Sequence, residues 1–219
     1  MKKSVIAFVI CALSLAFAFG AFADEAKVIK LPEPEKSGGI GVLDAIAARC
    51  SATDFVDTEI SEQDLSTLLW VAAGINRPDS HKITFATAMN LQDMIIYAFT
   101  KSGTYKYNPE NHSLELIAEG DKRVLTGSQP FVAKAAVDLL YIQDAAKWDG
   151  LNFKAPAENI LQCGFAHAGL SMQGVYLYAA SKNWGARTRM NFDREGLTKL
   201  LNLTDKHNFT LMICVGEVK

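Results

Sequence analysis

The chain has 219 residues, with 22 basic and 24 acidic side chains and a formal net charge of −2. No basic stripe runs along the sequence, which argues against nucleic acid as a partner. This length suits one domain that buries roughly 70% of the surface of its unfolded chain.

The first 23 residues have the layout of a secretory signal peptide. Lys2 and Lys3 precede an apolar run that ends in small residues at Ala23, just before Asp24. We therefore expect Sec-type export, cleavage after Ala23, and a periplasmic or secreted protein without a stable membrane anchor. A retained anchor is the alternative, but the apolar run lies near the lower length limit for spanning a bilayer.

Residues 24–42 contain two prolines, three glycines and many charges, which predicts an extended N-terminal arm leading into a turn. The predicted domain, residues 43–219, begins with a helix at 43–50. A second helix begins after Ser61, which forms an imperfect capping box with Asp64, and it ends at Gly74.

Alternating or continuous apolar runs predict strands at 93–100, 104–108, 113–120, 135–144 and 211–218. The longest predicted helix, about 156–182, has apolar residues spaced 4, 3, 4, 3 and 4 apart. These residues are Leu161, Phe165, Ala168, Met172, Val175 and Ala179. Such a stripe packs either against a partner helix or inside its own monomer, and the periodicity leaves both open.

Cysteine and histidine positions give little evidence for covalent or metal chemistry. Cys50, Cys163 and Cys214 remain after removal of the leader, and this odd number allows at most one internal disulfide. The four histidines lie far apart and none pairs with another ligand at helical spacing, so we predict no metal site.

Polar residues gather at 74–92, and arginines occur at 48–55 and 184–195. Arginine holds phosphate through planar bidentate donors, and an amide such as Asn90 can bind a ring edge that has both donors and acceptors. On a regular helix Asn90 and Gln92 would point about 200° apart, so we expect only Asn90 to face the ligand. Together these stretches predict a site for a phosphorylated heterocycle.

Several of these stretches carry a family resemblance. RCSATDF at 49–55, ISEQDLSTLLWVAAGINRP at 60–78, MNLQ at 89–92 and GDKRVLTGSQPFV at 120–132 resemble the nitroreductase superfamily of flavin-dependent oxidoreductases. The likeness extends over about 43–217 and is most specific at 60–78. It implies an α+β fold, with a mixed sheet flanked by helices and a long central dimer-core helix at 156–182.

The resemblance also implies a function. It predicts a homodimer that binds FMN at its interface, takes hydride from NADH or NADPH, and reduces a small organic acceptor such as a nitroaromatic or a quinone. Arg49 and Ser51 match the family's phosphate motif, and Arg189 matches a later arginine that reaches the phosphate. Asn90 matches the asparagine that bonds the flavin ring, and Thr87 lies in the same motif. No catalytic residue is assigned.

The chain departs from the family at the phosphate end. Cys50 and Thr53 replace the second and third arginines of the motif. If each lost charge-assisted hydrogen bond costs about 1.5 to 3 kcal/mol, FMN affinity falls by roughly two to four powers of ten. The alternative hypothesis is therefore a non-catalytic binding module on the same fold that has lost FMN.

Overall fold

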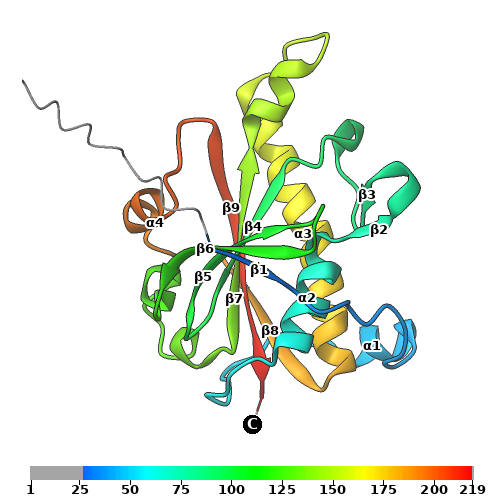
Figure 1. Ribbon diagram of the computed structural model, residues 1–219, viewed down its shortest axis with the longest axis vertical. Helices are drawn as coiled ribbons and strands as arrows, with labels where there is room; N and C mark the ends of the chain where they lie inside the picture. The colour runs from blue at the N-terminus through cyan, green and yellow to red at the C-terminus, as the bar shows by residue number, and fades with distance from the viewer. Residues whose placement is uncertain (1–26, 219) are drawn as a thin grey trace, which may run out of the picture.

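Seven strands form one sheet that runs through the middle of the molecule (Figure 1). The computed structural model describes residues 27–218, so the predicted signal peptide lies outside the described residues. The strand order across the sheet is β1-β6-β5-β4-β7-β9-β8. The strands are β1 Val28–Lys30, β4 Met94–Phe99, β5 Gly103–Asn108, β6 Ser113–Glu119, β7 Val137–Asp144, β8 Trp184–Arg189 and β9 His207–Glu217.

Neighbouring strands of this sheet pair in antiparallel fashion. Ser51 adds an isolated parallel bridge to Ala186 at the β8 edge. The α+β class and the helix-flanked sheet are confirmed, and the parallel component of the expected mixed sheet is limited to that bridge within residues 27–218. All five predicted strands are present, and Thr100 to Gly103 forms a hairpin turn between β4 and β5.

Helices cover both faces of the sheet. α2 (Glu62–Ala73) and α3 (Ala157–Ser181) pack on one face, and α4 (Arg194–Leu200) packs on the other. Leu139 and Tyr141 of β7 join the core beneath α2 and α3, whereas Leu140 and Ile142 join the core beneath α4. Side chains alternate along a strand, so a stretch buried on both faces, such as Leu139 to Ile142, favours apolar residues at successive positions. This explains the apolar run at the centre of β7, which the buried polar residues Asp138 and Gln143 flank.

α2 begins and ends where the sequence predicts. The Ser61 hydroxyl accepts a hydrogen bond from the Asp64 amide at 3.0 Å, as a helix N-cap should. Gly74 ends the helix with a φ of −73°, so it does not use the left-handed conformation common at helix ends. Glycine is needed there for space, because a Cβ atom would lie 2.3 Å from Cδ1 of Trp70.

The predicted apolar stripe of α3 packs within the chain. Ala168, Met172, Val175 and Ala179 are all buried against the sheet and α2, whereas Leu161 is 37% exposed. The monomer-core alternative therefore describes these four residues. The opposite side of α3 is exposed to solvent, including Gly169, Leu170 and Gln173.

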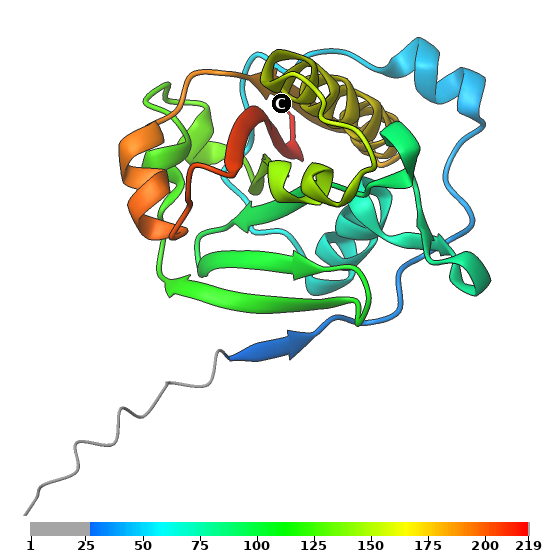
Figure 2. The same cartoon turned by 90° about the horizontal axis from the view of Figure 1, so that it is seen from above.

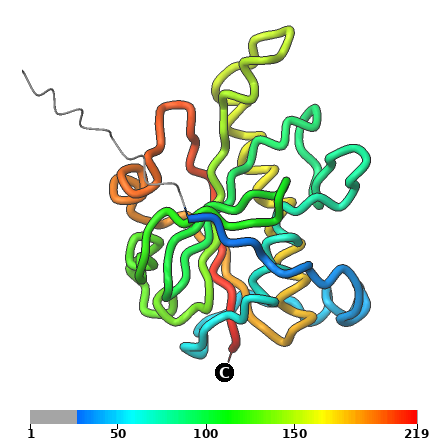
Figure 3. The backbone as a smooth tube through the Cα atoms, in the orientation of Figure 1, coloured from blue at the N-terminus to red at the C-terminus, as the bar shows by residue number. Residues whose placement is uncertain are grey.

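Two short segments flank α3. α1 (Val42–Ala48) packs beside it, and the segment between α2 and β4, residues 74–93, lies near its N-terminal half (Figure 3). That segment contains the small antiparallel pair β2 (Ile75–Arg77) and β3 (Lys82–Ile83). The 3₁₀ turns within the described residues are η1 Pro78–Ser80, η2 Ala88–Asn90, η3 Arg123–Thr126, η4 Val132–Lys134 and η5 Ala145–Gly150.

The described part of the N-terminal arm is attached to the domain. β1 pairs with β6 and forms the outermost strand of the sheet (Figure 2). Beyond it, the buried Ser66 hydroxyl of α2 donates to the Pro32 carbonyl at 2.6 Å. The Glu35 amide donates to the Thr67 hydroxyl at 3.0 Å. Backbone groups of the described part of the arm are thus hydrogen-bonded to β6 and to hydroxyl groups of α2.

Within residues 27–218, no helix combines the length and apolarity that crossing a membrane requires. The three cysteines of this region have free thiols: Cys50 is exposed, Cys163 is half-buried and Cys214 is buried. The same residues include no group of three or more histidine, cysteine or acidic side chains placed to hold a metal ion.

Candidate functional site

Arg49 and Ser51 lie together at the end of α1, beside the edge of the sheet. The Arg49 guanidinium is half-buried and lies 5.3 Å from the ring centroid of Tyr176 in α3. Ser51 is exposed, and its backbone bridge to Ala186 holds this segment alongside β8. A cation next to an exposed hydroxyl can bind an anion such as a phosphate.

Arg189 is placed differently, inside the protein. Its side chain is 7% exposed and donates to the Asn191 carbonyl at 2.6 Å and to the Cys214 sulfur at 3.8 Å. Its Nε atom is buried without a hydrogen-bond partner. A Cβ atom on Gly127 would lie 1.9 Å from its Nη2, so glycine is required to admit the guanidinium.

Arg49 and Arg189 lie on opposite sides of β8. The Thr188 hydroxyl contacts the Met172 sulfur at 3.6 Å, so Thr188 faces α3, as Arg49 does. Arg189 is the next residue in the strand and therefore faces the other way, over the ring of Phe131. The structure does not bring these two predicted phosphate ligands together within one chain.

Arg187 was not among the predicted phosphate ligands. Its guanidinium lies 4.4 Å from the centroid of the Phe131 ring, and its Nη1 donates to the Ala52 carbonyl at 3.2 Å. It is half-buried and adjoins the Ser51 segment more closely than Arg189 does. The signal for it was the two-residue spacing of Arg187 and Arg189 in a strand, which places both arginines on one face.

Residues 87–92 form an irregular turn, hereafter the amide loop. Three non-glycine residues in it have left-handed backbones: φ is 50° at Met89, 55° at Asn90 and 48° at Gln92. Gln92 Nε2 donates to Asn90 Oδ1 at 3.3 Å and to the His81 carbonyl at 2.8 Å. The expectation that Asn90 and Gln92 point apart is wrong, because it assumed a regular helix. The two amides lie side by side.

The amide loop is fixed to the protein at its start. Thr87 is half-buried, and its hydroxyl accepts a hydrogen bond from the backbone N–H of Gln92 at 3.0 Å. This contact closes the loop. The Ala88 amide donates to Nε2 of the buried His167 at 2.8 Å. Asn90 and Met89 are exposed at the tip. The loop therefore presents a polar amide pair to solvent from a well-anchored base.

Behind His167 lies the buried carboxylate of Asp93, which sequence reasoning missed. It contacts His167 Nδ1 at 2.7 Å and accepts from Gln143 at 2.8 Å and from Trp148 at 2.9 Å. Burial alone raises the pKa of Asp93, but the hydrogen bonds from His167, Gln143 and Trp148 outweigh it and hold the pKa below its ordinary value. No sequence spacing links residues 93 and 167, so the pair was not predictable.

The two groups of predicted ligands are separated within one chain. Arg49 packs on Tyr176, and the amide loop packs on His167, nine residues earlier in α3. Nine residues of α-helix place these contacts about 13 Å apart along the axis and about 180° around it. One chain thus offers two half-sites, a cation with a hydroxyl and a pair of amides. Their donor chemistry fits a phosphate and a heterocycle edge, the two ends of FMN.

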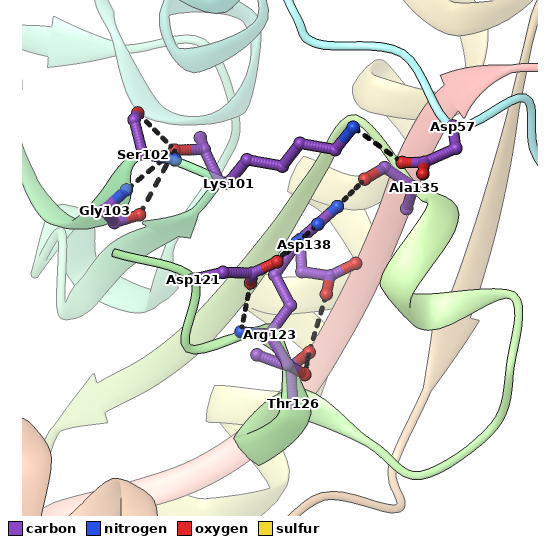
Figure 4. Close-up of polar contacts among 10 residues, drawn as sticks. Asp57, Lys101, Ser102, Gly103, Asp121, Arg123, Thr126, Ala135 and Asp138 are labelled. Carbon is purple, nitrogen blue, oxygen red and sulfur yellow. Dashed lines mark hydrogen bonds and ion pairs between the residues drawn. The ribbon is translucent and has the colours of Figure 1, made fainter. Parts of the chain in front are cut away.

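The motif at 120–132 folds over a buried polar cluster on the other face of the sheet (Figure 4). Arg123 is 3% exposed and is held by the Asp121 carboxylate and the Ala135 carbonyl. The Thr126 hydroxyl contacts the Asp138 carboxylate of β7 at 2.6 Å. These contacts attach the segment to the sheet, so this part of the family-like sequence serves the fold.

Comparisons with known proteins agree with this architecture. The sequence profile of the Nitroreductase family matches residues 46–217. A solved structure from Ralstonia eutropha JMP134, described as a nitroreductase, has a TM-score of 0.79 and 30% identity, and the match covers 88% of this chain and 90% of that one. No curated protein matches the sequence.

More distant structures share the fold. In the E. coli microcin synthetase McbBCD complex with truncated pro-MccB17, one chain has a TM-score of 0.66 and 18% identity over 97% of this chain and 85% of its own. The NADPH:FMN oxidoreductase of Vibrio harveyi, solved with NAD⁺, has a TM-score of 0.58 and 18% identity over 80% of this chain and 68% of its own. At such identity the likeness concerns the fold, because one fold can host several functions.

Proposed function

This chain belongs to the nitroreductase family, and on that premise we propose that it is an exported, FMN-dependent oxidoreductase that uses NADH or NADPH to reduce a small organic acceptor. The acceptor class would be nitroaromatics or quinones, which accept two electrons as hydride and proton. The observation that carries the proposal is the Asn90–Gln92 amide pair, with Asn90 exposed and Gln92 half-buried, presented by an anchored loop at the position of the family's flavin asparagine.

The residues would divide the work of holding FMN. Arg49 and Ser51 would bind the phosphate through charge-assisted and hydroxyl hydrogen bonds. Asn90 would bind the ring edge, and Thr87 would act by closing the amide loop behind it. When bound, FMN supplies the redox chemistry, and the protein supplies orientation and hydrogen bonds.

A second copy of the chain would complete the site. The half-sites lie about 180° apart around α3 in one chain, which favours a ligand held between two copies. Apolar side chains are exposed on α1 beside α3, where Val42 is 63%, Leu43 76% and Ile46 53% exposed. Leu170 on the outer side of α3 is 54% exposed. We propose that these surfaces form the interface of a homodimer.

The test is FMN binding by the mature protein, residues 24–219, followed by visible absorbance and titration. We expect Arg49→Ala and Asn90→Ala each to weaken FMN binding by about tenfold or more, because each removes a hydrogen bond worth about 1 to 3 kcal/mol. Matched controls are Arg194→Ala and Asn111→Ala, exposed residues of the same types elsewhere. Equal losses in controls and test variants would count against the assigned site.

The second candidate is a binding module on this fold that has lost FMN. The observation favouring it is the small number of positive charges near the predicted phosphate site. Cys50 and Thr53 are exposed and uncharged, and the Arg189 guanidinium is hydrogen-bonded to Asn191 and Cys214. A purified mature protein that remains colourless and does not bind added FMN would support this candidate and eliminate the oxidoreductase.

A further inference from the structure

We propose that His167 is a positioning residue: through the Ala88 amide it sets the Asn90–Gln92 amide pair, and only its neutral form does so. The choice of FMN as the ligand rests on the proposed function. The contacts of His167 come from the structure itself. The positioning role of His167 and the identity of the ligand can therefore be tested separately.

The contacts of His167 determine which ring nitrogen carries the proton. The Ala88 backbone N–H lies 2.8 Å from Nε2 and can only donate, so Nε2 must be the unprotonated nitrogen. Nδ1 then carries the hydrogen of the neutral ring and donates it to the Asp93 carboxylate at 2.7 Å. Asp93 thus fixes the ring in the tautomer that accepts from the loop.

Burial makes this arrangement specific. His167 is 4% exposed and Asp93 is 1% exposed, so water cannot readily replace either partner. Among the described residues, the His167 ring has two hydrogen-bond partners: the charged Asp93 carboxylate and the neutral backbone N–H of Ala88. Gln143 and Trp148, which complete the shell around Asp93 from β7 and η5, are also uncharged.

The loop needs such an anchor because its backbone is strained. Met89, Asn90 and Gln92 all have left-handed backbones, a conformation that only asparagine among them adopts readily. Strained conformations of this kind persist when surrounding contacts impose them. The Ala88 to His167 bond is the contact that attaches the start of the turn to the core, and Thr87 and Gln92 then close it.

Protonation of His167 would reverse the contact. A doubly protonated ring has a hydrogen on Nε2, which would face the Ala88 N–H, and two donors repel. The start of the loop would then lose its acceptor while Asp93 kept its partner. A protein with a protonated His167 would therefore release the amide pair and bind the ligand ring more weakly.

Three substitutions separate positioning from bulk packing. His167→Gln can place an amide oxygen near the former Nε2 position, where it accepts from Ala88 without titrating. His167→Asn reaches only the former Nδ1 position, so it keeps a donor for Asp93 and loses the contact with Ala88. His81→Gln is the matched control, because His81 touches the same loop through its backbone carbonyl and its exposed ring contacts Glu110.

The first measurement is the FMN dissociation constant of the mature protein at about pH 5.5 and about pH 7.5. We expect His167→Asn to bind FMN about fivefold to a hundredfold more weakly at the higher pH, the effect of leaving the Ala88 donor unsatisfied. Wild type and His81→Gln should weaken on acidification. His167→Gln should bind at both pH values without that loss.

The second measurement needs no ligand: the hydrogen-exchange protection factor of the Ala88 amide, measured by NMR on the same variants. Protection in wild type and His167→Gln, with loss in His167→Asn, supports the proposal even if FMN does not bind, in which case the proposed function alone fails. Equal protection in all variants overturns it. Acid weakening of FMN binding that persists in His167→Gln also overturns it, because another group would then be responsible.

Discussion

Asp138 places a carboxyl group inside the sheet, on the side opposite α2 and α3. It is fully buried, and its Oδ2 atom accepts from the Thr126 hydroxyl at 2.6 Å. Burial raises the pKa of Asp138 to about 6, against smaller lowering effects from Cys214, Thr126 and the nearby Arg123 and Arg189. The folded protein therefore binds this proton more tightly than the unfolded chain does.

This pKa predicts a pH-dependent stability. Because the folded pKa lies above the ordinary value of 3.8, the contribution of Asp138 to the free energy of unfolding falls as pH rises from about 3.8 to about 6. Asp138→Asn cannot titrate, so we expect its stability relative to wild type to rise by about 2 to 3 kcal/mol between pH 4 and pH 7. Urea unfolding at several pH values measures this difference in the free energy of unfolding, with Asp79→Asn, at an exposed position, as the control. A constant difference across this range would contradict the assignment.

At the same scale, the sequence does not report the contacts that arrange the predicted ligand residues. Arg49, Ser51 and Asn90 are accessible, as a ligand site requires, whereas Arg189 is enclosed by Gly127, Asn191 and Cys214. The Asp93 to His167 contact joins residues 74 apart in the chain, and no local pattern reports it. Left-handed backbone at Met89 and Gln92 was equally unpredictable, since neither residue favours it.

At the scale of elements, local chemistry explains most of what was predicted. Ser61 begins α2, and the alternating and continuous apolar runs became strands, because burial on one or both faces of a sheet dictates those patterns. The α3 stripe was ambiguous, because periodicity identifies an apolar face without identifying its partner. Only the packing of Met172 and Val175 on the chain's own sheet resolved it.

The end of α2 depends on a glycine for steric reasons. A Cβ at residue 74 would lie 2.3 Å from the Trp70 side chain and 2.7 Å from its Cα. The Trp70 indole also donates to the Ile75 carbonyl, so it cannot move without losing that bond. We expect Gly74→Ala to lower the free energy of unfolding by about 1 to 3 kcal/mol, the usual cost of overpacking.

Denaturant unfolding of Gly74→Ala should be compared with Gly150→Ala. A Cβ on Gly150 meets nothing within 4 Å, so that variant controls for the general effect of replacing glycine by alanine. If both variants unfold at the same denaturant concentration, the contact with Trp70 does not determine how α2 ends.

At the scale of the whole molecule, the separation of the half-sites links assembly to ligand binding. Arg49 and the amide loop contact α3 through Tyr176 and His167, about half a turn out of phase. If a ligand such as FMN contacts both the Arg49 half-site and the amide loop, a second chain would have to complete its binding site. Dimer formation and FMN affinity should therefore be lost together when the exposed side of α3 is altered.

Leu170→Glu tests this link. Leu170 is 54% exposed on α3, so a charge there should leave the monomer folded while making burial between two copies costly. We expect sedimentation velocity to show a shift from dimer to monomer, and FMN titration to show at least about tenfold weaker binding, the effect of losing about 1.4 kcal/mol or more. Val124→Glu is the control, because Val124 is 76% exposed in η3, on the other face of the sheet. A Leu170→Glu protein that remains dimeric would place the interface elsewhere, and a monomer that binds FMN as wild type does would show that one chain contains the whole site.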